Sequence, residues 1–245
     1  MITASYLHFS NTLCYCSQNS LHAYTENMIT PTYSKNEELA NTLSHGLGAL
    51  LSLVAIVLLL SNAVTNSTVG YSINNELMRI VSFSVYGSSL LILFLSSTFY
   101  HATTNSQSKK VFKLLDHCAI YVLIAGTYTP LLLLSLSGLL GYSLMIVIWL
   151  IAISGIFFKF KFGHKYKKIS LATYVGMGLI AFTILGELYK VLPTNAVSLL
   201  AIGGLVYLVG VYFYVQKNIP FNHAIWHLFV LSGAACHFFM IYWYV

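Results

Sequence analysis

Seven long apolar runs dominate the sequence and decide what such a chain can fold into. An α-helix needs about 20 predominantly apolar residues to cross the hydrocarbon core of a bilayer, and each run reaches or nearly reaches that length. The runs cover Ala40–Ser61, Ile80–Tyr100, Cys118–Leu136, Leu139–Phe158, Ile169–Gly186, Ala196–Val215 and Ala224–Val245. Their apolar residues are continuous, whereas the strands of a transmembrane β-barrel alternate. The sequence therefore predicts an all-α integral membrane protein, a bundle of seven transmembrane helices.

Composition agrees with this class and divides the chain into two parts. Charged residues make up 7% of the chain, against about 25% in a typical soluble domain. Residues 1–35 are polar and lack the basic start and apolar core of a signal peptide, so we expect a disordered tail before a membrane domain at 36–245. The opening tripeptide MIT recurs at Met28-Ile29-Thr30, which suggests Met28 as an alternative start.

The net charge of +6 raises the question of a nucleic-acid partner, but the positions of the cations argue against one. Lysines cluster in two loops between apolar runs: Lys109, Lys110 and Lys113, and then Lys159, Lys161, Lys165, Lys167 and Lys168. With a cytoplasmic N-terminus, the tail and the second, fourth and sixth loops hold ten of the twelve cations. Cytoplasmic loops are enriched in Lys and Arg. We therefore expect the N-terminus inside, the C-terminus outside, and basic loops that contact membrane lipids.

Polar and ionisable groups within the apolar runs mark a candidate site. A charged side chain at the centre of a membrane helix costs about 2.5–3.5 kcal/mol, so such residues are functional candidates by default. They occur at four helix ends: His45 near the start of the first span, Ser97 and His101 at the end of the second, Asp116 at the start of the third, and His223 and His227 at the start of the seventh. In a seven-span bundle these four ends lie on one membrane face. We expect the groups to converge there.

Their spacing indicates metal chemistry. Residues four apart share a helix face, so two imidazoles, from His223 and His227, can bind one zinc ion at roughly 2.0–2.1 Å. A third imidazole, from His101, gives a three-histidine set that leaves one position for water, as in catalytic zinc sites. Asp116 would orient that water or a histidine ring, and Ser97 could hydrogen-bond a substrate carbonyl. The sequence predicts a zinc site with Asp116 and Ser97 as catalytic residues.

Each of these residues also has a simpler interpretation. Ser97 could bond back to a carbonyl of its own helix, and Asp116 could cap the third helix. His45 fits either a supporting position near the metal or an interfacial ring. His117 is rotated by about 100° from Asp116, which favours a position facing the headgroups. His237 lies deeper in the last helix, where we expect a packing or hydrogen-bonding role.

Four stretches together resemble the haemolysin III family, within the superfamily of progestin and adipoQ receptors and alkaline ceramidases. They read EELANTLSHGLGALL (37–51), SSTFYHA (96–102), LLDHCAIYVLIAGTYTP (114–130) and HAIWHLFVLSGAACHFF (223–239). In adiponectin-receptor relatives, the corresponding histidines bind zinc and the aspartate contacts the zinc-bound water. The resemblance implies zinc ligation by His101, His223 and His227, with Asp116 beside the water.

Three functions follow as hypotheses for a protein of the cell membrane. The first is a zinc-dependent hydrolase of a lipid amide or ester, an activity that the resemblance to the superfamily also implies. The second is a pore-forming cytolysin, which the family name implies. A single bundle shows little sign of a pore lined with polar groups through the whole membrane, so an oligomer would have to form one. The third is a receptor or regulator with a structural zinc ion.

Overall fold

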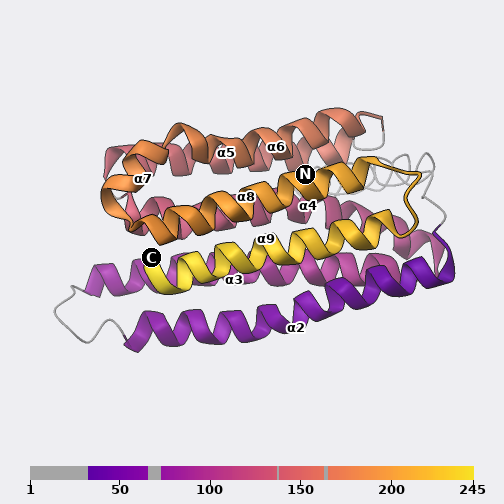
Figure 1. Ribbon diagram of the computed structural model, residues 1–245, viewed down its shortest axis with the longest axis horizontal. Helices are drawn as coiled ribbons and strands as arrows, with labels where there is room; N and C mark the ends of the chain where they lie inside the picture. The colour runs from indigo at the N-terminus through magenta and orange to yellow at the C-terminus, as the bar shows by residue number, and fades with distance from the viewer. Residues whose placement is uncertain (1–32, 66–72, 137, 163–164) are drawn as a thin grey trace, which may run out of the picture.

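The computed structural model describes residues 33–65, 73–136, 138–162 and 165–245, and these ranges are helical with short connections. The helices, labelled as in Figure 1, are α2 (Lys35–Thr65), α3 (Ile73–Ala102), α4 (Ser106–Pro130), the π-helical turn η2 (Leu131–Ser135), α5 (Leu139–Phe162), α6 (Lys167–Thr183), α7 (Leu185–Val191), α8 (Thr194–Val215) and α9 (Asn222–Tyr244). Within the described ranges there is no strand, so the predicted all-α class is confirmed. The predicted tail and the alternative start at Met28 lie almost wholly outside these residues.

Six helices are long and apolar enough to cross a membrane: α2, α3, α4 with η2, α5, α8 and α9. The remaining predicted span, Ile169–Gly186, is divided between α6 and α7, which are bent by 52° at their junction. The backbone leaves helical geometry at Ile184, with φ −112° and ψ 6°, and Gly186, a poor helix former, follows. The chain is a multi-pass membrane protein, with seven spans if α6 and α7 cross as one bent span.

Two helix starts near the candidate site are fixed by side-chain caps. Ser34 and Glu37 form a capping box at α2, with Ser34 N to Glu37 Oε2 at 2.8 Å and Glu37 N to Ser34 Oγ at 3.3 Å, which satisfies free backbone donors. Asn105 caps α4, since its Oδ1 accepts from the amides of Gln107 and Ser108 at 3.0 Å. The interpretation of Asp116 as the cap of this helix is therefore wrong. Asp116 lies in the third turn, with its side chain free for another role.

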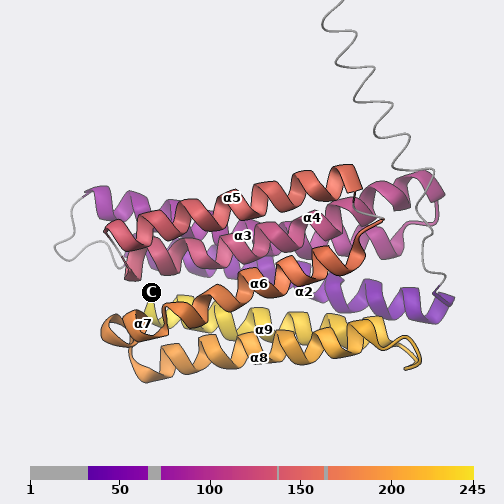
Figure 2. The same ribbon diagram turned by 90° about the horizontal axis from the view of Figure 1, so that it is seen from above.

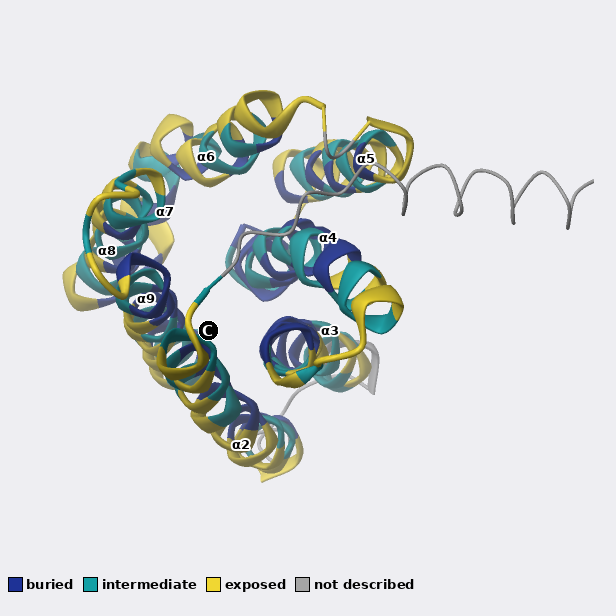
Figure 3. Ribbon diagram, turned by 90° about the vertical axis from the view of Figure 1, so that its right-hand side faces the viewer, coloured by how far each residue is buried: buried dark blue, intermediate teal, exposed yellow. Residues whose placement is uncertain are grey.

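The helices pack as sequential neighbours, with one contact that closes the order. α2 packs against α3, α3 against α4, α4 against α5, and α8 against α9, while α9 returns to pack against α2. Figure 3 looks along the helices from the end where α9 begins, and Figure 2 shows the same helices from the side. The contact of α2 with both α3 and α9 brings the end of α3 and the start of α9 to the same place.

Candidate metal centre

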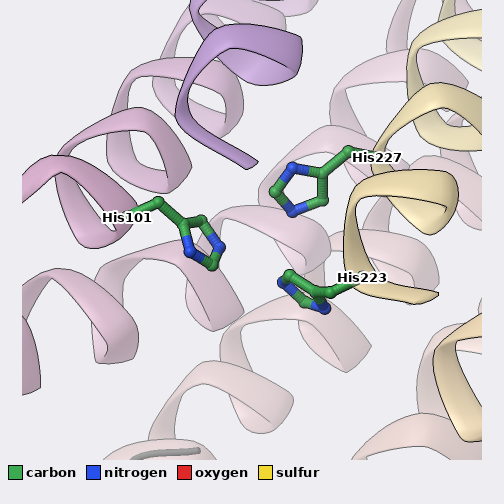
Figure 4. A group of neighbouring side chains, drawn as sticks. All are labelled: His101, His223 and His227. Atoms are coloured by element: carbon green, nitrogen blue, oxygen red, sulfur yellow. The ribbon is translucent and has the colours of Figure 1, made fainter. Parts of the chain in front are cut away.

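Three histidines meet where α3 ends and α9 begins. His101 lies in the last turn of α3, and His223 and His227 lie one turn apart at the start of α9. All three are buried, and one nitrogen of each lies within 4.8 Å of the others. Figure 4 shows the three rings turned toward one another. The expected convergence of sequence-distant helix ends is therefore present in the fold.

Glu38 of α2 holds the ring of His101. Nδ1 of His101 lies 2.6 Å from Oε2 of Glu38, and the other carboxylate oxygen accepts from Nζ of Lys109 at 2.7 Å. Nε2 of His101 is buried and makes no hydrogen bond. A carboxylate behind one ring nitrogen fixes the tautomer and leaves the other nitrogen as a metal ligand.

His227 is oriented in a similar way by α2. Its Nδ1 lies 3.2 Å from the backbone oxygen of Asn41 and 3.1 Å from Oγ of Ser44. Donation of the Nδ1 proton to that carbonyl leaves a lone pair on Nε2. The α2 helix thus presents acceptors to two of the three rings.

His223 has both ring nitrogens buried without a hydrogen bond. Its ring stacks on that of Tyr33, with centroids 5.2 Å apart and planes 24° apart. Tyr33 precedes α2, and burial raises the pKa of its hydroxyl above that of a free tyrosine.

This donor set fits a metal ion. Buried polar atoms are nearly always hydrogen-bonded, yet Nε2 of His101 and both ring nitrogens of His223 have no such partner in the part of the chain that the structure describes. A cation between the three rings would satisfy one nitrogen of each. Imidazole nitrogens suit zinc, copper, iron and nickel better than magnesium or calcium. The geometry therefore supports a transition-metal site.

Ser97 and Asp116, the two predicted catalytic residues, lie next to this centre but outside its ligand group. The Asp116 carboxyl is close enough to interact with the His101 ring and with Ser97, and it lines a cavity shared with His223 and His227. Oγ of Ser97 is buried and makes no hydrogen bond to a carbonyl of its own helix. The interpretation that it does so is therefore wrong. Both side chains are available to a bound molecule.

Sequence reasoning missed the residues of α2 that hold the histidines. The spacing and polarity patterns alone assign Glu38, Asn41 and Ser44 no role at the metal. A signal was present, because Glu38, Asn41 and His45 lie three and four residues apart around the start of the first apolar run. Such spacing places them on one helix face.

The three other histidines that the structure describes occupy different positions. His45 is buried and stacks on His227, with ring centroids 3.5 Å apart, so it is not an interfacial ring. The expectation that His117 faces the headgroups is wrong: it lines the cavity, because α6 packs over it and Tyr174 donates to its backbone oxygen at 2.9 Å. Nε2 of His237 lies 3.2 Å from the backbone oxygen of Leu200, which confirms its hydrogen-bonding role.

A cavity of about 410 Å³ extends from the histidines between α4, α6, α8 and α9. His223, His227 and Asp116 line it, and so does His237, ten residues further along α9. Most of its wall is apolar, formed by side chains such as Ile120, Ile124, Leu171, Val175, Leu208 and Val211. The metal centre therefore faces a space that suits an apolar molecule.

The sequence of this chain is similar to those of several known proteins. The family model described as haemolysin-III related matches residues 33–238. Hemolysin-3 from Bacillus cereus is 43% identical over 221 residues, which cover 90% of this chain and 97% of the relative. The Hemolysin-3 homolog of Bacillus subtilis (strain 168) is 43% identical over 86% of this chain and 96% of its own. The human monocyte to macrophage differentiation factor is 33% identical over 75% of this chain and 78% of its own.

Proposed function

This chain belongs to the haemolysin III family, and on that premise we propose that His101, His223 and His227 bind zinc and that the centre hydrolyses an amide or ester bond of a lipid. The observation that carries the proposal is the group of three buried imidazoles with a carboxylate behind one of them. Three protein ligands leave a fourth zinc position for water or substrate, the pattern of catalytic rather than structural sites.

Zinc bound there would supply Lewis acidity and a water whose pKa lies near 7. Asp116 is the nearby group that would accept a proton from this water and return it to the leaving group. The Ser97 hydroxyl would donate a hydrogen bond to the carbonyl oxygen of the substrate as negative charge develops on it. Glu38 keeps the His101 ring in one orientation throughout.

The apolar cavity supports a lipid as the substrate. A lipid chain could lie along the wall formed by α4, α6 and α8, with its amide or ester carbonyl at the histidine end. Burial of the chain would remove water from the apolar walls and contribute to binding.

Turnover by purified protein tests the hydrolase. Zinc-loaded protein should hydrolyse at least one member of a panel of N-acyl amides and acyl esters, and the His227→Ala variant should lose both zinc and turnover. His237→Gln is the matched control on the same helix, and it should keep its zinc. Turnover that persists in zinc-free protein would contradict the proposal.

Membrane lysis is a second candidate, because two relatives carry the name Hemolysin-3. A water-filled pore needs polar groups along its whole depth, whereas the histidines, Ser97 and Asp116 of this chain gather at one end of the bundle. Lysis would therefore require an oligomer. Release of a trapped dye from liposomes by purified protein tests this function, and intact liposomes at high protein-to-lipid ratio would exclude it.

A regulatory protein with structural zinc is the third candidate. The histidines come from α3 and α9, and both of these helices pack on α2. A metal between the histidines would join α3 directly to α9 beside α2. Zinc removal would then lower the melting temperature of a protein that shows no turnover with any substrate of the panel.

The proposed orientation has the N-terminus in the cytoplasm and the C-terminus outside. The support is the distribution of ten of twelve cations over the tail and the second, fourth and sixth loops, as the positive-inside rule requires. In this orientation the metal centre lies near the cytoplasmic face.

A further inference from the structure

Four lysines line the cavity, and the proposed hydrolysis uses none of them. They come from four separate segments: Lys113 of α4, Lys159 of α5, Lys167 at the start of α6, and Lys217 between α8 and α9. Among the described residues of the cavity wall, Asp116 is the one carboxylate. The wall therefore carries a large excess of positive charge.

Two of these lysines are buried to an unusual degree. Lys113 is 6% exposed and Lys159 is 3% exposed, and the Asp116 carboxylate lies within electrostatic range of both. Lys113 lies within electrostatic range of both Lys159 and Lys167. Lys217 also lies near Lys167, and its Nζ donates to the backbone oxygen of Tyr214 at 2.6 Å. Like charges so close together repel, which an anion among them would relieve.

Further groups beside the lysines favour an anion. α6 begins at Lys167 without a side-chain cap, and the N-terminus of a helix attracts negative charge. One turn into α6, the Ser170 hydroxyl is 1% exposed, lines the cavity and makes no hydrogen bond. It could donate to an anion that also contacts Lys167.

We propose that this end of the cavity binds the phosphate-monoester head of a single-chain lipid, whose acyl chain lies along the apolar wall. A phosphate monoester carries about −1.5 to −2 charges at pH 7, which matches four lysines and one carboxylate better than the single charge of a fatty acid does. Lysine is a common point-charge ligand of phosphate. The apolar wall formed by α4, α6 and α8 would hold the acyl chain of this lipid.

The two proposals share the apolar wall of one cavity, but recognition of the anionic head does not depend on the proposed hydrolysis. The lysines are not in the histidine group, and binding of an anionic head requires no covalent step. A lipid could be bound there as a ligand whether or not it is cleaved. Failure of the hydrolase would therefore leave this inference standing, and the reverse also holds.

Binding to the zinc-loaded full chain in nanodiscs of neutral lipid tests the proposal. The probe is oleoyl lysophosphatidate, compared with oleoyl lysophosphatidylcholine, which has the same chain but a zwitterionic head, and with inorganic phosphate. We expect lysophosphatidate to bind at least about tenfold tighter than lysophosphatidylcholine, since hydrogen bonds to charged groups are among the stronger ones. Equal affinity for the two lipids would contradict recognition of an anionic head group. If inorganic phosphate bound as tightly as lysophosphatidate, the claim that the ligand is a lipid would be wrong.

A pair of double variants separates the cavity lysines from general surface charge. Lys159→Gln with Lys167→Gln removes two lysines of the wall, whereas Lys161→Gln with Lys168→Gln removes two exposed lysines from the same helices. The first variant should lose the preference for lysophosphatidate and the second should retain it. Equal losses in both would contradict the proposal. Should the first variant fail to fold, Lys159→Arg with Lys167→Arg keeps both charges and must retain the preference.

Discussion

At the scale of single residues, the candidate metal centre depends on the groups that hold its histidine rings in place. Glu38 accepts from Nδ1 of His101 and is itself held by Lys109, while Asn41 and Ser44 contact Nδ1 of His227. These contacts fix which nitrogen of each ring faces the centre. The α2 helix contributes no residue to the ligand group, yet it orients two of the three ligands.

Glu38→Gln should weaken zinc binding by about 10–100-fold, the usual cost of losing a group that orients a ligand. The amide is a poorer acceptor for the Nδ1 proton and no longer raises the basicity of the ring. Zinc affinity measured by competition with a chelator gives the result. Glu37→Gln is the matched control, because glutamine also serves in a capping box, and its zinc affinity should be unchanged. Equal affinities for both variants would contradict the role of Glu38.

Asp116→Asn should lower turnover by about 10²–10⁴-fold, the usual contribution of a general acid–base residue. Zinc content should stay at the wild-type level, because Asp116 is outside the ligand group. Metal analysis beside steady-state kinetics distinguishes this outcome from a structural effect. Parallel loss of zinc and turnover would instead make Asp116 part of the binding site.

At the scale of helices, close packing of α2 on α3 sets the position of the site. A Cβ built on Gly48 would lie 2.4 Å from Cδ1 of Phe94, and the Phe94 ring is buried and meets the edge of His45 at 5.0 Å. Small residues let membrane helices approach closely. His45 in turn stacks on His227, so this contact reaches the metal centre.

Gly48→Ala should destabilise the protein by about 1–3 kcal/mol, the typical cost of overpacking. Gly46→Ala is the matched control: its Cβ would have Cγ2 of Thr98 as nearest neighbour at 3.8 Å. Alanine there should be neutral or stabilise by up to about 1 kcal/mol, from its higher helix propensity. Thermal unfolding of both variants in the same detergent measures the difference. A Gly48 variant as stable as the Gly46 variant would show that Phe94 can move aside.

At the scale of the whole molecule, different contacts hold the helices together at the two ends of the bundle. Away from the histidines, Arg79 of α3 donates to the backbone oxygen of Val245 at 3.2 Å and to Oδ1 of Asn62 at 2.9 Å. These bonds join α2, α3 and the C-terminus. At the other end, α2 contacts His101 of α3 and His227 of α9 through Glu38, Asn41 and Ser44, and a bound metal would add a direct link between α3 and α9.

Zinc removal should lower the melting temperature by roughly 8–16 °C. A ligand at about 1,000 times its dissociation constant stabilises the folded state by about 4 kcal/mol, and each kcal/mol corresponds to about 2–4 °C for a chain of this size. Scans with and without a chelator measure the shift, and re-addition of zinc should reverse it. The His101→Ala variant is the control, since a chelator should not change its melting temperature.

Reporter fusions test the proposed orientation. A phosphatase that is active only outside the cytoplasm should be active when it is fused after Val245 and inactive when it is fused in the lysine-rich connection between α5 and α6. The reverse pattern would place the lysine-rich loops outside and contradict the positive-inside argument.

The sequence by itself determined the membrane class and the convergence of three histidines, because span length and the parity of crossings fix which helix ends share a face. The tertiary structure alone decided which side chains meet across helices. α5 and α8 are apolar on nearly all sides, so no periodic pattern fixes their rotation about their own axes. For this reason the inward position of Lys159 on α5 is known only once the helices are packed. The contact of Glu38 with His101 joins residues 63 apart in the sequence, and no proline marks the bend between α6 and α7.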